Sequence, residues 1–77
     1  MIVLLFARAR DLVGADHVEV GDAATVGTLR RELVSRYPHL AGLLEKSAFA
    51  INDEFADDAA SIPPGAEVAL LPPVSGG

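Results

Sequence analysis

The chain has no cysteine among its 77 residues. Without a thiol it forms no disulfide, holds no thiolate-bound metal and carries no cysteine nucleophile. Proteins of the cytoplasm, where disulfides are rare, tolerate this absence well, and we expect a cytoplasmic protein. Any covalent chemistry of the chain has to use another group.

Basic residues are few, and none follows Lys46. Six Lys and Arg side chains stand against eleven Asp and Glu, which gives a formal net charge of −5. The charged residues beyond Lys46 are all acidic: Asp53, Glu54, Asp57, Asp58 and Glu67. Such a surface repels a phosphate backbone, so we expect no nucleic-acid partner. It is compatible with plain solubility or with a partner that has a basic surface.

Long hydrophobic runs are also absent. The apolar stretch at residues 1–7 is too short to cross a bilayer, and it lacks the basic lead-in and cleavage site of a signal peptide. We therefore expect no membrane partner. Even so, 51% of the residues are hydrophobic, and the length is that of one domain with a modest core.

Short apolar segments separated by turn residues predict a sheet with one main helix. Strands are predicted at residues 1–6, 17–20, 48–51, 55–56 and 66–71, with a hairpin turn at 52–54. Val26, Leu29, Leu33, Val34 and Tyr37 recur at helical spacing. Thr25 is a suitable N-cap, and Pro38 ends this helix after about 11 residues. Residues 7–16 are interpreted as a connection with a helical turn, and residues 39–46 as another such turn.

This order of elements predicts an α+β fold with a single mixed sheet. One helix cannot cover both faces of the sheet, so it lies across one face, and the first and last strands lie side by side in the centre. That is the ubiquitin-like β-grasp arrangement. We expect residues 1–71 to form this domain and residues 72–77 to form a flexible tail that ends in Gly-Gly.

The alternation of side chains along a strand predicts which apolar residues point away from the helix. Val3, Leu5, Val68 and Leu70 are expected to face the helix, and the open face receives Ile2, Leu4, Phe6 and Leu71. An apolar open face around Phe6 and Leu71 is predicted to be a partner interface. The alternative is that neighbouring loops cover it.

The last six residues, Pro-Pro-Val-Ser-Gly-Gly, carry the strongest functional signal. Pro72 and Pro73 have no amide donors, so the sheet cannot continue through them, and they stiffen the chain as it leaves the body. Val74, Ser75, Gly76 and Gly77 then follow, and four extended residues reach roughly 13–14 Å. Because the final pair has no Cβ, the carboxylate of Gly77 can enter a narrow channel of another protein and react there.

The terminal carboxylate of Gly77 is ionised at neutral pH and can attack the α-phosphate of ATP. Adenylation converts it into a mixed anhydride, from which a sulfur donor can displace AMP and leave a thiocarboxylate. The ATP is bound by an activating enzyme, and this chain needs no cofactor of its own. Chance alone would place Gly-Gly at the end of roughly 0.5% of chains, given a glycine frequency of about 7%.

Other candidate sites are weaker. His17 and His39 have no Cys or Glu at ligand spacing, so we interpret them as surface residues and predict no metal site. The pair Asp57 and Asp58 is interpreted as a solvated acidic loop. Ser75 lacks the Gly-x-Ser-x-Gly pattern of a nucleophile elbow. The chain is therefore not expected to be an enzyme on its own.

Three segments carry a resemblance to a known family. They are the opening Met-Ile-Val-Leu-Leu-Phe-Ala-Arg-Ala-Arg-Asp-Leu-Val-Gly, the helix from Thr25-Val26 through Leu29 and Leu33, and the ending Gly-Ala-Glu-Val-Ala-Leu-Leu-Pro-Pro-Val-Ser-Gly-Gly. Over its whole length the sequence resembles the MoaD family, the small subunits of molybdopterin synthase, within the MoaD/ThiS group. That family usually has an aromatic residue before the two prolines, where this chain has Leu71.

The resemblance implies a sulfur carrier. An activating enzyme of the ubiquitin-E1-like type would adenylylate Gly77, and a desulfurase or sulfurtransferase would supply the sulfur. The tail would enter the large synthase subunit, in an assembly of two small and two large subunits. Sulfur would then pass to the cyclic pyranopterin precursor in molybdenum cofactor biosynthesis.

Three alternatives stay open from the sequence. In the first, the chain is a thiocarboxylate carrier for thiamine synthesis, cysteine synthesis or transfer-RNA thiolation. In the second it is a ubiquitin-like modifier joined to lysines through Gly77. In the third it is a binding module with an inert tail.

Overall fold

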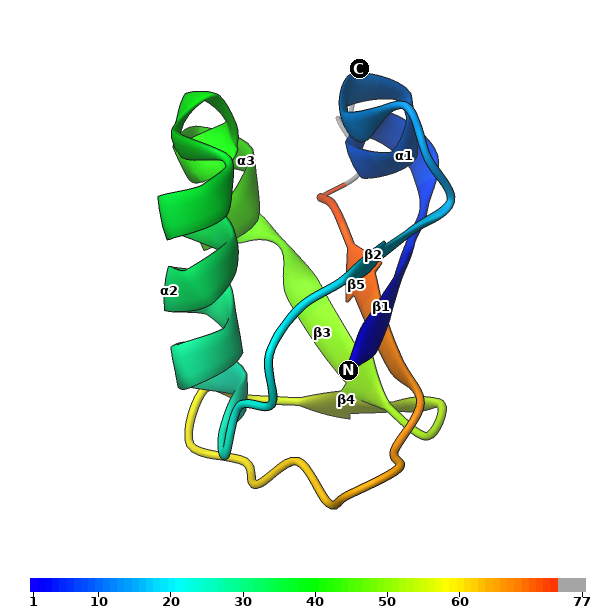
Figure 1. The fold of residues 1–77 in the computed structure, drawn as a ribbon, viewed down its shortest axis with the longest axis vertical. Coiled ribbons are helices and arrows are strands. Elements are labelled where there is room, and N and C mark those ends of the chain that lie inside the picture. The colour runs from blue at the N-terminus through cyan, green and yellow to red at the C-terminus, as the bar shows by residue number, and fades with distance from the viewer. Residues whose placement is uncertain (74–77) are drawn as a thin grey trace.

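The structure is a computed structural model, and it describes residues 1–73. This part of the chain contains five strands and four helical segments (Figure 1). In chain order they are β1 (Ile2–Leu5), α1 (Ala7–Val13), β2 (His17–Glu19), α2 (Val26–Arg36), the 3-10 helix η1 (Pro38–Leu40), α3 (Ala41–Lys46), β3 (Ala48–Ile51), β4 (Glu54–Ala56) and β5 (Val68–Leu71). The predictions for Val74, Ser75, Gly76 and Gly77 lie outside the described residues.

The strands form one mixed sheet in the order β2-β1-β5-β3-β4. The first strand β1 and the last strand β5 are parallel neighbours, and every other pairing is antiparallel. Helix α2 crosses one face of this sheet (Figure 1). The prediction of an α+β β-grasp fold, with the first and last strands side by side, is confirmed.

The hydrophobic core lies between the sheet and α2. Val3, Phe49, Val68 and Leu70 of the sheet and Val26, Leu29 and Leu33 of α2 are each at most 1% exposed. Leu5 is also buried, so the predicted inward set of β1 and β5 is confirmed. Burial of a side chain of this size stabilises the fold by about 1.5–3 kcal/mol.

The first turn of α2 is closed by its cap and by a distant loop. The Oγ1 of Thr25 accepts a hydrogen bond from the amide of Thr28 at 3.2 Å, which confirms the predicted N-cap. The amides of Val26 and Gly27, which lack partners within the helix, donate to the carbonyls of Ala60 and Asp58. A Cβ at Gly27 would lie 3.1 Å from the Asp58 carbonyl oxygen, so glycine permits this close approach.

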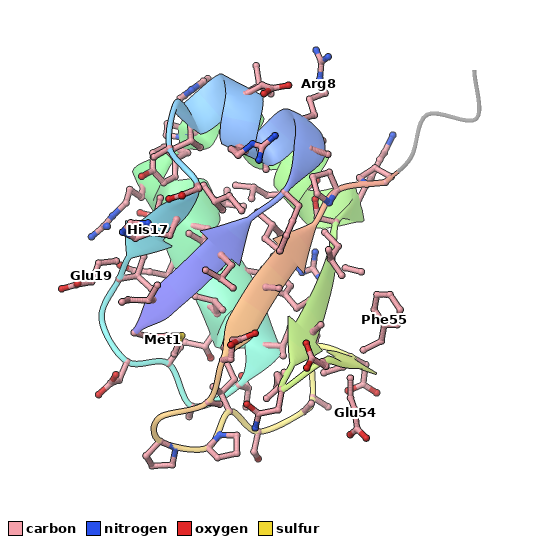
Figure 2. All side chains as sticks on the ribbon, turned by 90° about the vertical axis from the view of Figure 1, so that its right-hand side faces the viewer. Met1, Arg8, His17, Glu19, Glu54 and Phe55 are labelled. Atoms are coloured by element: carbon pink, nitrogen blue, oxygen red, sulfur yellow. The ribbon has the colours of Figure 1, made fainter. Side chains whose placement is uncertain are left out.

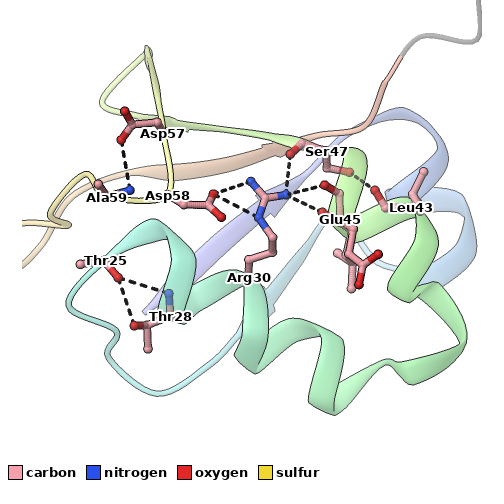
Figure 3. Close-up of polar contacts among 10 residues, drawn as sticks. Thr25, Thr28, Arg30, Leu43, Glu45, Ser47, Asp57, Asp58 and Ala59 are labelled. Atoms are coloured by element: carbon pink, nitrogen blue, oxygen red, sulfur yellow. Dashed lines mark hydrogen bonds and ion pairs between the residues drawn. The ribbon is translucent and has the colours of Figure 1, made fainter.

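Arg30 of α2 joins three parts of the fold (Figure 3). Its Nη1 donates to the carbonyls of Leu44 at 2.6 Å and Ser47 at 2.7 Å, where α3 gives way to β3. Its Nη2 and Nε donate to the carboxylate of Asp58 at 2.8 and 3.2 Å. The guanidinium carbon lies 5.0 Å from the ring centre of Phe49, in cation–π range. One partly buried cation therefore holds α2, the α3–β3 junction and the loop after β4 together.

Two helical predictions were too short. The segment interpreted as a connection with one helical turn contains the seven-residue helix α1, and residues 38–46 form both η1 and α3. Helix α1 begins at Ala7, which has a positive φ of 50°. An alanine gives no sequence signal for that conformation, since L-residues rarely adopt it.

Four strands also differ from the prediction at their ends. Strand β1 spans residues 2–5 where 1–6 was predicted, and β2 spans residues 17–19 where 17–20 was predicted. The hairpin turn consists of Asn52 and Asp53 alone, both with positive φ, and Glu54 belongs to β4. Asn and Asp tolerate this conformation best among residues with a side chain. Strand β5 begins at Val68 because the Ala66 amide is still bonded to the Pro63 carbonyl in the preceding turn.

Replacing Arg30 by methionine tests its structural role. We expect Arg30→Met to lower the free energy of unfolding by about 2–4 kcal/mol, because buried carbonyls lose a charged donor. Urea denaturation measures the change. Arg31→Met is the matched control, since Arg31 is exposed and its side chain donates a weak hydrogen bond of 3.4 Å to the hydroxyl of Thr28; we expect less than about 0.5 kcal/mol there. Equal losses in the two variants would contradict this role.

Candidate functional site

The base of the tail is held at the end of the sheet. Leu71, the last residue of β5, pairs with Ala48 of β3. On the other side Leu70 pairs with Leu5, which places Phe6, the next residue, at the level of Leu71. Pro72 is half-buried and Pro73 is exposed, and both follow the end of β5. The point from which the tail leaves is thereby fixed by two neighbouring strands.

The face of the sheet opposite α2, here called the open face, carries three rows of side chains (Figure 2). The row nearest the tail contains Phe6, Leu71 and Ala48. The middle row contains His17, Leu4, Ala69, Ala50 and Phe55. The row farthest from the tail contains Glu19, Ile2 and Glu67. The two rows nearer the tail are thus mostly apolar, whereas the far row is acidic at two of its three positions.

Large apolar side chains are exposed on this face. Ile2 is 51% exposed, Phe6 44% and Phe55 79%, while Leu4 and Leu71 are half-buried. The structure brings Phe6 and Leu71 to the same row, as strand parity predicted. Their role as a partner interface stays a prediction. The sequence did not predict that Phe55 lies on this face, because that position follows only from the pairing of Phe55 with Ala50.

The two histidines lie in separate places. His17 is paired with Asp16 at 2.7 Å between Nδ1 and Oδ1, and this hydrogen bond, with the charge of the ring, lowers the pKa of the Asp16 carboxyl. The ring of His39 lies edge-on to that of Tyr37. Within residues 1–73 no group of three His, Cys, Asp or Glu side chains is arranged to hold a metal ion.

The described part of the chain holds its polar groups in structural roles. Among these residues every buried side-chain nitrogen and oxygen has a hydrogen-bond partner. No helix described here has both the length and the apolar character needed to span a membrane. The described body thus combines an open face that carries exposed apolar side chains with the start of the tail beside it.

The sheet order, the parallel pairing of β1 with β5 and the covering helix define a ubiquitin-like β-grasp protein. Within that class the chain belongs to the ThiS family, whose family model matches residues 3–77.

Relatives with known names cover nearly the whole chain. The molybdopterin synthase sulfur carrier subunit of Escherichia coli (strain K12) is 40% identical, over 97% of this chain and 96% of that protein. A solved complex of subunits 1 and 2 of molybdopterin-converting factor from Helicobacter pylori contains a chain that is 26% identical with a TM-score of 0.68, covering 99% and 96%. The small archaeal modifier protein 1 of Haloferax volcanii is 30% identical with a TM-score of 0.73, covering 95% of each chain.

Two phenylalanines in neighbouring strands test the division between core and open face. We expect Phe49→Ala to destabilise the protein by about 3–5 kcal/mol, because it empties a fully buried site. Phe55→Ala is expected to cost less than about 1 kcal/mol, since that ring is mostly exposed. Urea denaturation of both variants measures the difference. A large loss from Phe55→Ala would mean that its ring packs into the fold, against the arrangement described above.

Proposed function

We propose that this protein is the sulfur-carrier small subunit of molybdopterin synthase. Sulfur is carried as a thiocarboxylate on the terminal carbonyl of Gly77 and passes to the cyclic pyranopterin precursor in molybdenum cofactor biosynthesis. The observation that carries the proposal is the full-length match to the ThiS family and to a named sulfur carrier subunit, in a chain that ends in Pro-Pro-Val-Ser-Gly-Gly.

The position of β5 supports a tail that works inside another protein. This strand is hydrogen-bonded on both sides, so the first residue of the tail has a fixed position relative to the open face. Pro72 and Pro73 end the ladder, and four extended residues beyond them reach roughly 13–14 Å. An extended tail of this length would bring the carboxylate of Gly77 to catalytic side chains that belong to a partner.

The chemistry of loading follows from the carboxylate. One oxygen of the Gly77 carboxylate attacks the α-phosphorus of ATP, pyrophosphate leaves, and an acyl adenylate remains. The terminal sulfur of a persulfide on a desulfurase or sulfurtransferase then attacks the carbonyl carbon, and AMP leaves with the electron pair of the carbon–oxygen bond. A second thiol of the donor protein cleaves the resulting acyl disulfide, which releases the thiocarboxylate and leaves a disulfide on the donor. The ATP and the catalytic groups belong to an E1-like activating enzyme. The carrier supplies a reacting end without a side chain beside it.

The large synthase subunit is the partner that the open face fits. The row with Phe6 and Leu71 adjoins the start of the tail, so a protein that admits the tail also covers this row. The Helicobacter pylori neighbour is a complex of subunits 1 and 2, which supports a pairing with a large subunit. We extend the proposal to an assembly of two small and two large subunits in the cytoplasm.

Loading of the carrier is tested by intact mass. Incubation with ATP, a sulfide source and the activating enzyme is expected to replace one oxygen of the protein by sulfur. Deletion of Gly77 is expected to abolish the change, whereas Ser75→Ala keeps it because the carboxylate is intact. An unchanged mass of the unaltered protein, with the activating enzyme active on a known carrier, would overturn the proposed function.

Binding to the large subunit tests the interface role of Phe6 and Leu71. We expect Phe6→Ser and Leu71→Ser each to weaken binding by about tenfold or more, because each removes apolar area from a buried contact. Calorimetric titration of the full chain into the large subunit measures this. Leu12→Ser is the control, since Leu12 of α1 is 45% exposed but lies outside the open face. Equal affinities for all three variants would place the interface elsewhere.

A second function is favoured by one comparison. The small archaeal modifier protein 1 has the same fold and 30% identity, and a modifier shares the adenylation of the terminal glycine with a carrier. The mass experiment does not separate the two functions, but a search for isopeptide-linked adducts does. Adducts that disappear on deletion of Gly77 would support a modifier.

A further inference from the structure

The open face is hollowed at the end farthest from the tail. A cavity of about 460 Å³ lies between the start of β1 and the loop that leads to β5. Its lining is largely apolar and includes Ile2, Leu4, Ala23, Ile62, Pro63 and Pro64. Two carboxylates, those of Asp22 and Glu67, also line it. We call this cavity the acidic hollow.

The carboxylates of the acidic hollow are available to an incoming cation. The backbone of Glu67 is held by Asn52 through two hydrogen bonds, of 2.8 and 3.0 Å, but no ion pair involves its side chain within residues 1–73. Asp22 is 99% exposed and lies 3.8 Å from the ammonium of Met1. That ammonium donates to the Val20 carbonyl at 2.7 Å. It offsets one of the two negative charges and leaves the other uncompensated.

We propose that the acidic hollow receives an arginine or lysine side chain from the protein that covers the open face. This inference rests on the proposed function, and the partner it names is the large synthase subunit. The apolar lining suits the aliphatic stem of such a side chain, and the carboxylates of Asp22 and Glu67 suit its cationic end. A partner carboxylate would meet like charge there. A purely apolar residue would remove the carboxylate of Glu67 from water without a partner.

The hollow is continuous with the apolar part of the open face. Ile2 and Leu4 belong both to its lining and to the rows described above. Glu67 comes four residues before Leu71, which in an extended chain corresponds to a distance of about 13–14 Å. The partner therefore carries its basic side chain about that far from the mouth of the channel that admits the tail. Contact at both ends of the face fixes the direction in which the carrier docks.

The affinity of the full chain for the large subunit, measured by calorimetry at low and moderate salt, tests the inference. We expect Glu67→Lys to weaken binding by about tenfold or more and Glu67→Gln by less, with a smaller salt dependence in both. Glu32→Lys is the matched control, because Glu32 is an exposed carboxylate on α2, away from the open face; we expect a change below about twofold. If Glu67→Lys binds as tightly as Glu32→Lys, the inference is wrong.

Two further measurements separate the remaining outcomes. If the unaltered chain fails to bind the large subunit, the proposed function fails together with this inference. If it binds and the Glu67 variants bind equally well, only the acidic hollow is excluded from the interface. A second copy of the chain as the occupant would appear as a monomer–dimer equilibrium that Glu67→Lys shifts in sedimentation, and that result would also overturn the inference. Urea denaturation of each variant confirms that it folds.

Discussion

The contacts of the Arg30 guanidinium are the interaction on which the arrangement of the other elements depends. This cation fixes the junction of α3 and β3, and β3 pairs directly with β5. Through Asp58 it also fixes the loop that crosses the start of α2. In a domain with so small a core, hydrogen bonds to a charged donor supply order that apolar contacts alone do not. The position of the tail thus depends on a residue in a helix on the other side of the sheet.

The two faces of the sheet differ in what covers them. One face of the sheet is closed by α2 and forms the core, and the other face keeps exposed apolar side chains beside the base of the tail. Under the proposed function the reacting atom is the terminal carbonyl carbon of Gly77, so no side chain of the body is needed for the chemistry. A body of this kind can be small, because it has only to hold a surface and the start of a tail in a fixed relation.

The sequence predicted the features that local patterns determine. The helical spacing from Val26 to Tyr37, with Thr25 before it and Pro38 after it, gave α2 its correct ends, and alternation placed Val3 and Val68 inside. The length of helix α1 was underestimated because its first residue is an alanine with a positive φ, which gives no sequence signal. The position of Phe55 on the open face depends on the register of β3 and β4. The acidic hollow brings residues near 22 together with residues 62–67. Such contacts between distant segments leave no periodic signal in one sequence.

The pairing of β1 with β5 limits when the sheet can form during synthesis of the chain. Strand β5 lies in the interior of the sheet, yet the ribosome makes it after every other strand of this chain. Non-local pairing of this kind cannot form until the later segment exists. The sheet of the nascent chain therefore cannot be completed before residues 68–71 have been made. A chain that stops before Val68 therefore lacks both the middle of its sheet and the Pro-Pro-Val-Ser-Gly-Gly segment.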